Sequence, residues 1–309
     1  MVTPELVEIT PNDLLVRANW IQTMQSRTGL FLDSTAAAEA ALEAEIAQNG
    51  ASPLLAHLRL CGTIPESFGH DSSEEKLYSK YTDAVLCETF RFLGMRSLVL
   101  AGRADCADVE AFSSDHSFDL VADAKVFRLS RTAKNAKDFK VASMNRWKYG
   151  KKYATVVCPI YQLPTSNSQI YEQAIALDVC ILSYSHLATL VTYKNLGLGS
   201  PEEVLQSVLD VTTYANPSKS SVDYWTAINR AFIEFDRANM AELWAREKRA
   251  NVEAIACAKV EALTHLAAER SRIMNLSHDE AVKMLITMRK IDSREAYIKS
   301  VTDNLLLSR

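Results

Sequence analysis

At 309 residues the chain is large for one domain and small for two, so we expect one compact core with helical additions. Its 48% apolar and 23% charged residues exclude a disordered chain, and no apolar run is long enough to cross a bilayer. A net charge of −4 argues, as an average, against a nucleic-acid partner.

The cysteines and the N-terminus bear on the cellular compartment. The six cysteines show no paired spacing and mostly lie in apolar segments, so we expect reduced core residues without disulfides or zinc. Residues 1–6 lack the basic and then apolar pattern of a signal peptide. We therefore expect a cytoplasmic protein with no membrane partner.

The N-terminal part is predicted to be helical. Residues 13–24 and 34–48 have the composition of helices. A better-defined helix is predicted over 73–93, because its apolar residues share one face and Gly94 follows its end.

A buried strand is predicted over 118–127, where an apolar run is interrupted by two charged residues. A strand repeats every two residues, so Asp123 and Lys125 project from the same face, about 7 Å apart. Burying either charge is unfavourable unless it is paired or bound to a metal. The two residues therefore form either a structural ion pair or part of a metal site.

A second carboxylate strengthens the metal interpretation. Asp108 lies in a short predicted strand, 106–112, joined to the first by the polar turn 113–117. Such a hairpin brings Asp108 alongside Asp123. Two close carboxylates repel unless a cation lies between them, and their hard oxygen atoms suit Mg²⁺. Lys125, which cannot bind a metal while protonated, would then lie beside the attacking water or the charge developing on phosphorus.

Positive charge is concentrated between Lys125 and Lys152. This segment holds ten Lys or Arg residues against one acid, a local balance of +9 that leaves −13 for the remainder. A solvated basic helix is the plain alternative, but the side-chain types favour contacts with DNA phosphates and base edges. The candidate DNA-binding residues are Arg128, Ser130, Arg131, Thr132, Lys134, Asn135 and Lys137.

Further strands are predicted over 97–101, 152–158 and 179–184. A helix is predicted over 137–148, and we interpret its apolar stripe as core packing. No second histidine stands at ligand spacing from His186, which we therefore interpret as structural.

After residue 199 the chain is predicted to be almost wholly helical. Apolar residues step by three and four through 225–235, which predicts one long helix able to run beyond Ala250. Ser277 and Glu280 mark the start of another helix by their capping-box spacing. These helices either cover the sheet or contribute to a dimer interface.

The arrangement of Asp108, a hairpin and Asp123-Ala-Lys125 resembles the active site of the PD-(D/E)XK nuclease superfamily. The longer string over 120–141 closely resembles the HindIII-type family of type II restriction endonucleases, with a matching region at about 60–190. The departure from the superfamily motif is Ala107, where proline is usual. Proline shapes that turn and contributes no ligand, so the departure matters little.

The resemblance implies an α/β fold with a mixed central β-sheet of the restriction-endonuclease-like type, flanked by helices and extended by N- and C-terminal helical regions. We expect a single catalytic domain over 1–309, made of a helical part (1–70), a nuclease core (71–196) and a second helical part (197–309). The resemblance to the superfamily also implies that Asp108, Asp123 and Lys125 are catalytic and that the two acids bind Mg²⁺. Superfamily members often add a glutamate from the preceding helix, which makes Glu75 a candidate accessory acid, although helix capping with Ser72 is the favoured role.

Type II restriction endonucleases of this kind cut double-stranded DNA. The resemblance implies a homodimer that cuts the palindrome AAGCTT after the first A, with 5′ overhangs, and a cognate DNA methyltransferase in the same system. A less sequence-specific repair or recombination nuclease of the superfamily is the alternative. A DNA-binding module with the same fold but no catalysis is less favoured, because Asp108, Asp123 and Lys125 are all present.

Overall fold

The computed structural model describes residues 7–27, 31–100, 105–131 and 135–300. The chain divides into two units, Met1–Glu261 and Ala262–Arg309. The sheet, its flanking helices and the candidate site all belong to the first unit. The elements of that unit before the sheet are α1 (Pro11–Ser26), α2 (Phe31–Asn49), α3 (Ala51–Leu60) and α4 (Ser73–Leu93).

A five-stranded mixed sheet forms the centre of the first unit, with the strands in chain order. β1 and β2 pair antiparallel, as do β2 and β3, whereas β3, β4 and β5 run parallel. The parallel strands β3 and β4 are buried along nearly their whole length, as expected for strands covered on both faces. The strands are β1 (Arg96–Val99), β2 (Val109–Phe112), β3 (Asp119–Ala124), β4 (Tyr153–Cys158) and β5 (Cys180–Ser183).

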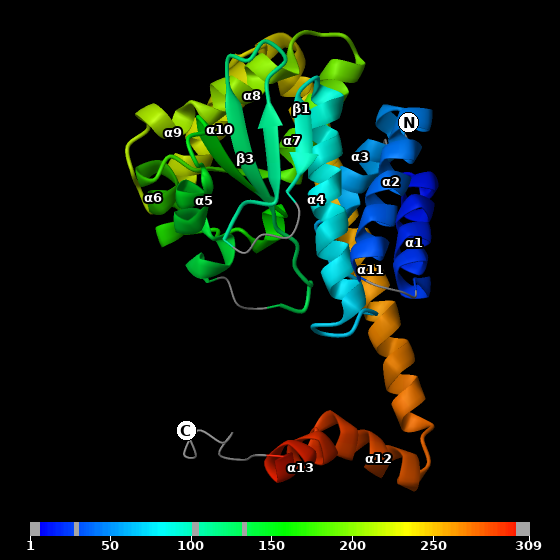
Figure 1. Cartoon of the computed structure of the whole chain (residues 1–309). Helices are drawn as coiled ribbons and strands as arrows, with labels where there is room; N and C mark the ends of the chain where they lie inside the picture. The colour runs from blue at the N-terminus through cyan, green and yellow to red at the C-terminus, as the bar shows by residue number, and fades with distance from the viewer. Residues whose placement is uncertain (1–6, 28–30, 101–104, 132–134, 301–309) are drawn as a thin grey trace, which may run out of the picture. The chain divides into compact units, whose positions relative to one another are not determined.

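Helices cover both faces of this sheet. Figure 1 shows α4 on one side of the strands and α5 (Val141–Trp147) and α6 (Gln169–Ala176) on the other. The helix predicted over 137–148 is divided, because Lys140 has a left-handed backbone (φ 51°) between a 3-10 turn, Ala136–Phe139, and α5. Its apolar stripe is buried, which confirms the prediction of core packing. The mixed α/β fold class is likewise confirmed.

α4 begins and ends where its sequence signals predict. The Ser72 hydroxyl accepts a hydrogen bond from the Glu75 backbone N–H, and Gly94 ends the helix with a left-handed φ of 107°. Most residues in its second half are buried, because α4 lies between the sheet and the N-terminal helices. Asp83 is one of these buried residues.

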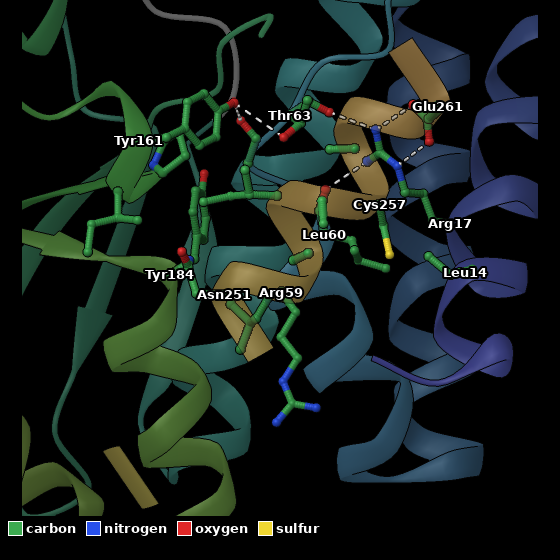
Figure 2. A pocket seen from close by; sticks show the side chains of 18 of the residues that line it. Leu14, Arg17, Arg59, Leu60, Thr63, Tyr161, Tyr184, Asn251, Cys257 and Glu261 are labelled. Atoms are coloured by element: carbon green, nitrogen blue, oxygen red, sulfur yellow. Dashed lines mark hydrogen bonds and ion pairs between the residues drawn. The ribbon is translucent and has the colours of Figure 1, made fainter. Parts of the chain in front are cut away.

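A buried arginine connects the N-terminal helices to the rest of the first unit. Arg17 of α1 donates to the carbonyl oxygens of Leu60 and Thr63, and twice to Glu261 of α11 (Arg237–Met274) (Figure 2). It also donates to the Tyr78 hydroxyl. A largely apolar cavity of about 440 Å³ lies beside it. All the polar hydrogens of this guanidinium therefore have acceptors within the protein.

The remaining helices differ from the prediction in one respect. The long helix expected through 225–250 is two helices, α10 and α11, interrupted at Phe235 and Asp236. The Asp236 carboxylate accepts the Asn239 backbone N–H, which favours a new helix start there. The other helices of this half are α7 (Tyr184–Asn195), α8 (Pro201–Leu209), α9 (Val211–Tyr214), α10 (Ser221–Glu234) and α11 (Arg237–Met274).

The second unit holds the end of α11, α12 (His278–Met288) and α13 (Ile291–Ser300). Ser277 and Glu280 form the capping box predicted at the start of α12. In the described part of the chain, no helix is both long and apolar enough to cross a membrane. Cys61, Cys87, Cys158 and Cys180 are free thiols buried in the core, as expected.

Candidate active site

The hairpin of β2 and β3 brings the two predicted metal ligands together. Val109 is opposite Ala122 in the antiparallel register, and the Asp108 backbone N–H donates to the Ala122 carbonyl oxygen at 3.2 Å. Asp108, just before β2, is thereby placed beside Asp123 near the end of β3. Their carboxyl groups are close enough to share a hydrogen bond when one of them carries a proton.

Asp123 is the most unusual side chain of this site. It is fully buried, and among the described residues neither carboxylate oxygen accepts a hydrogen bond of ordinary geometry. Its close partner of opposite charge is the Lys125 ammonium group, in an ion pair. Burial and, less strongly, the neighbouring Asp108 raise the pKa of Asp123 to about 7, against the attraction of the Lys125 ammonium group.

The two carboxyl groups have opposite pKa shifts. Burial acts to raise the pKa of Asp108, but the hydrogen bond with Asp123 and the nearby Lys80 and Lys125 outweigh it and lower that pKa. The two carboxyl groups therefore titrate as a pair, with the pKa of Asp108 lowered and the pKa of Asp123 raised.

Lys125 is fixed at its backbone as well as at its side chain. Its N–H donates to Val157 of β4 at 2.8 Å, and its carbonyl oxygen accepts from the Tyr184 hydroxyl at 3.0 Å. Burial opposes the charge on the ammonium group, yet the Asp123 carboxylate outweighs burial and raises the pKa of Lys125. The lysine is therefore cationic and held close to the carboxylates.

Two residues of α4 complete the group, and neither was predicted. The Lys80 ammonium lies 3.0 Å from Asp83 Oδ2 and 3.4 Å from Asp108 Oδ1. Asp83 is only 3% exposed, and burial together with Asp108 raises its pKa well above the usual range. The candidate site thus contains three carboxyl groups and two ammonium groups.

Glu75, the predicted accessory acid, lies elsewhere. Its carboxylate is 3.0 Å from the Arg128 guanidinium and accepts the Asp71 backbone N–H at 2.6 Å. It is two helical turns before Asp83, a separation of about 12 Å along the axis. Glu75 also stands within 4.8 Å of possible ligand atoms of His70 and Asp71, both exposed.

Several of the predicted DNA-binding residues contact acids of the protein. Arg128 donates to Glu75 and to the carbonyl oxygens of Pro65 and Gly69, and Ser130 donates to Glu66. These contacts neutralise part of the segment's positive charge.

The other described residues of the basic segment lie in or just before the 3-10 turn Ala136–Phe139. Arg131 pairs with Asp138 at 2.6 Å and covers the Phe127 ring. Asn135 caps the turn that contains Lys137. Two of the predicted residues, Thr132 and Lys134, lie outside the described part of the chain.

The donor set fits a hard divalent cation. Asp108, just before β2, and Asp123 of β3 offer carboxylate oxygens next to each other, and the Asp123 oxygens are buried with the Lys125 ammonium group as their cationic partner. A buried carboxylate in this state is stabilised by a bound cation. Asp108 and Asp123 are therefore the residues that would hold such an ion, while Lys125 stands beside it.

A mixed sheet that carries paired carboxylates and a lysine at the ends of β2 and β3 defines a restriction-endonuclease-like protein of the PD-(D/E)XK class. The model of the HindIII restriction endonuclease family matches residues 18–302. The chain is also 31% identical, over 256 residues, to the type II restriction enzyme HindIII of Haemophilus influenzae, with 80% of this chain and 84% of that one covered.

The chain therefore belongs to the HindIII restriction endonuclease family, and it is a type II restriction enzyme, a site-specific deoxyribonuclease. This membership confirms the family resemblance found in the sequence.

Proposed function

We propose that this protein makes Mg²⁺-dependent double-strand cuts in DNA at a short palindrome, AAGCTT, after the first A of each strand, and leaves 5′ overhangs. The observation that carries the proposal is the fully buried Asp123 carboxylate, which lies beside the Asp108 carboxylate and is paired with the Lys125 ammonium group. The sequence preference is drawn from the similarity to HindIII.

The proposed chemistry divides between the three residues. A bound Mg²⁺ would supply Lewis-acid polarisation of the scissile phosphate. Asp108 and Asp123 would hold this ion. The Lys125 ammonium orients the attacking water and stabilises the negative charge that develops on phosphorus. The products are a 5′-phosphate and a 3′-hydroxyl.

A palindromic site is read most simply by a two-fold homodimer, in which each active site cuts one strand. We propose this assembly, a cytoplasmic location and a companion DNA methyltransferase that protects the same sequence. We also propose that the segment over 128–137 contacts the DNA, because its sequence concentrates basic, hydroxyl and amide donors.

The mechanism is tested with Asp123→Asn and Lys125→Ala. Each variant should lose cleavage by about a thousandfold or more, because each removes a group that acts on the reacting phosphate. Binding of a duplex containing the site should change little. The matched control is Asp115→Asn in the exposed turn of the same hairpin, which should cut at the wild-type rate. Cleavage by either active-site variant near the wild-type rate would remove the proposed site.

The DNA contact is tested separately. Arg131→Ala and Lys134→Ala should each weaken binding and reduce the dependence of affinity on salt by about one phosphate contact. Unchanged affinity, salt slope and sequence preference in both variants would contradict the assignment.

One digest separates restriction from the alternative. Long unmethylated DNA should give discrete fragments that share one end sequence. A smear of random ends would instead indicate a repair or recombination nuclease of the same superfamily.

A further inference from the structure

Lys80 occupies a position that is suited to a second cation. Its ammonium group bridges Asp83 of α4 and Asp108 of the hairpin, at 3.0 and 3.4 Å. Asp83 and Lys80 are three residues apart on one helix, so their pair alone would be an ordinary helix contact. Asp108 is 28 residues away in sequence and is a predicted metal ligand, which makes the bridge part of the active site.

Asp108 therefore lies between two positions for positive charge. On one side are Asp123 and Lys125, and on the other are Asp83 and Lys80. A carboxylate with this placement is the usual bridging group of a two-metal site, where the ions lie about 3.5–4 Å apart. Here the second position already holds an ammonium group of the protein.

An ammonium group and a divalent ion cannot share that position. Both would bind the same carboxylate oxygens of Asp83 and Asp108. Two positive charges only a few ångströms apart also repel each other strongly in a site that is largely shielded from water. Lys80 is 32% exposed at its side chain, so it has room to move toward solvent or toward a DNA phosphate. Asp83, which is almost fully buried, has no such freedom.

We propose that Lys80 is the resident cation of a second cation position formed by Asp83 and Asp108, and that a second divalent ion enters only by displacing the Lys80 ammonium group. The proposal rests on the proposed metal site at Asp108 and Asp123. Lys80 is thus a positioning residue that holds Asp83 and Asp108 together and sets how many divalent ions each active site takes up.

The test counts Mn²⁺ ions bound to the full-length protein without DNA, by calorimetric titration with electron paramagnetic resonance of the free ion. The wild type should bind one ion tightly per chain and a second at least tenfold more weakly. Lys80→Met should tighten the second ion at least tenfold, because the competing charge is gone, and Lys80→Gln should act in the same direction.

Three further variants locate the effect. Lys76→Met removes an exposed lysine one turn earlier on α4 and should bind ions like the wild type. Lys80→Arg keeps the charge and should keep the second ion weak. The double variant Lys80→Met with Asp83→Asn should lose the second ion and keep the first. Circular dichroism and thermal unfolding confirm that each variant is folded.

The proposal is overturned if the wild type binds two ions equally tightly, or if neither Lys80→Met nor Lys80→Gln changes the number or affinity of the ions. Weaker binding of the second ion in both variants would also overturn it, because Lys80 would then assist the metal and not compete with it. Asp123→Asn separates this outcome from the proposed function. If the wild type binds no ion, or if Asp123→Asn retains the first ion, the metal site itself is wrong.

Discussion

Arg17 and Asp123 are both buried charges, and their surroundings are opposite. Arg17 donates to two backbone carbonyl oxygens and to Glu261 (Figure 2), and also to Tyr78, so each of its donors is satisfied. Asp123 is more deeply buried, yet neither of its oxygens accepts a hydrogen bond of ordinary geometry from the described residues. A buried charge with a full set of partners stabilises the fold, whereas one without them indicates a place where a ligand binds.

The largest effect on stability is expected at Arg17. Arg17→Met should lower the free energy of unfolding by about 3–5 kcal/mol, because it removes the ion-pair partner of Glu261, a donor to the Leu60 carbonyl oxygen and one of two donors to the Thr63 carbonyl oxygen. Urea denaturation measures the loss. Cleavage by the folded fraction should stay close to the wild-type rate, since Arg17 does not contact the site.

An exposed ion pair provides the matched control. Arg230 and Glu234 are 71% and 50% exposed, so Arg230→Met should change the free energy of unfolding by less than about 0.5 kcal/mol. If both arginine variants lost the same stability, the burial and hydrogen bonds of Arg17 would not explain its effect.

His186 extends the comparison to a buried neutral group. One ring nitrogen accepts the Ser183 backbone N–H and the other bonds the Asn229 side chain, which confirms that His186 is structural. Burial lowers the pKa of His186 to about 4, below the value of about 6.5 for an exposed histidine. Below pH 6.5 the unfolded chain binds a proton that the folded protein does not.

Stability should therefore fall as the pH drops from about 6.5 to about 4, by roughly 3 kcal/mol from this residue. Urea midpoints across this range measure the slope. His186→Gln should flatten it, while His278→Gln at the exposed start of α12 should not. Equal slopes in all three proteins would contradict the assignment of the shift to His186.

The smallest effect on stability is expected at Asp123, whose carboxylate does not have a full set of hydrogen-bond partners among the described residues. In the absence of divalent ions at pH 8, Asp123→Asn should leave the free energy of unfolding within about 1 kcal/mol of the wild type or raise it. The amide oxygen can still accept from Lys125, and Asp108 still offsets the lysine charge. A loss above about 2 kcal/mol would mean that Asp123 and Lys125 form a structural ion pair.

Local patterns in the sequence were enough to predict the frame of the site. The apolar run over 118–127 contains β3, and the polar turn after Phe112 closes the predicted hairpin. Period-two geometry placed Asp123 and Lys125 together, and the capping residues placed the start and end of α4. Each of these features depends on neighbours within a few residues.

Asp83 and Lys80 could not be predicted in this way. Three residues apart on a helix, they have the spacing of a surface ion pair. Their role depends on the packing of α4 against the hairpin, which brings Asp108 to them. The same limitation applies to Arg128, whose acidic partners Glu66 and Glu75 come from more than fifty residues earlier.

The most direct test of the account is a crystal soaked with Mn²⁺, with the ion located by its anomalous scattering. The account predicts an ion bonded to carboxylate oxygens of both Asp108 and Asp123, at about 2.1–2.3 Å, and no such ion in Asp123→Asn. An ion bound instead at His70, Asp71 and Glu75, or no ion between Asp108 and Asp123, would contradict it.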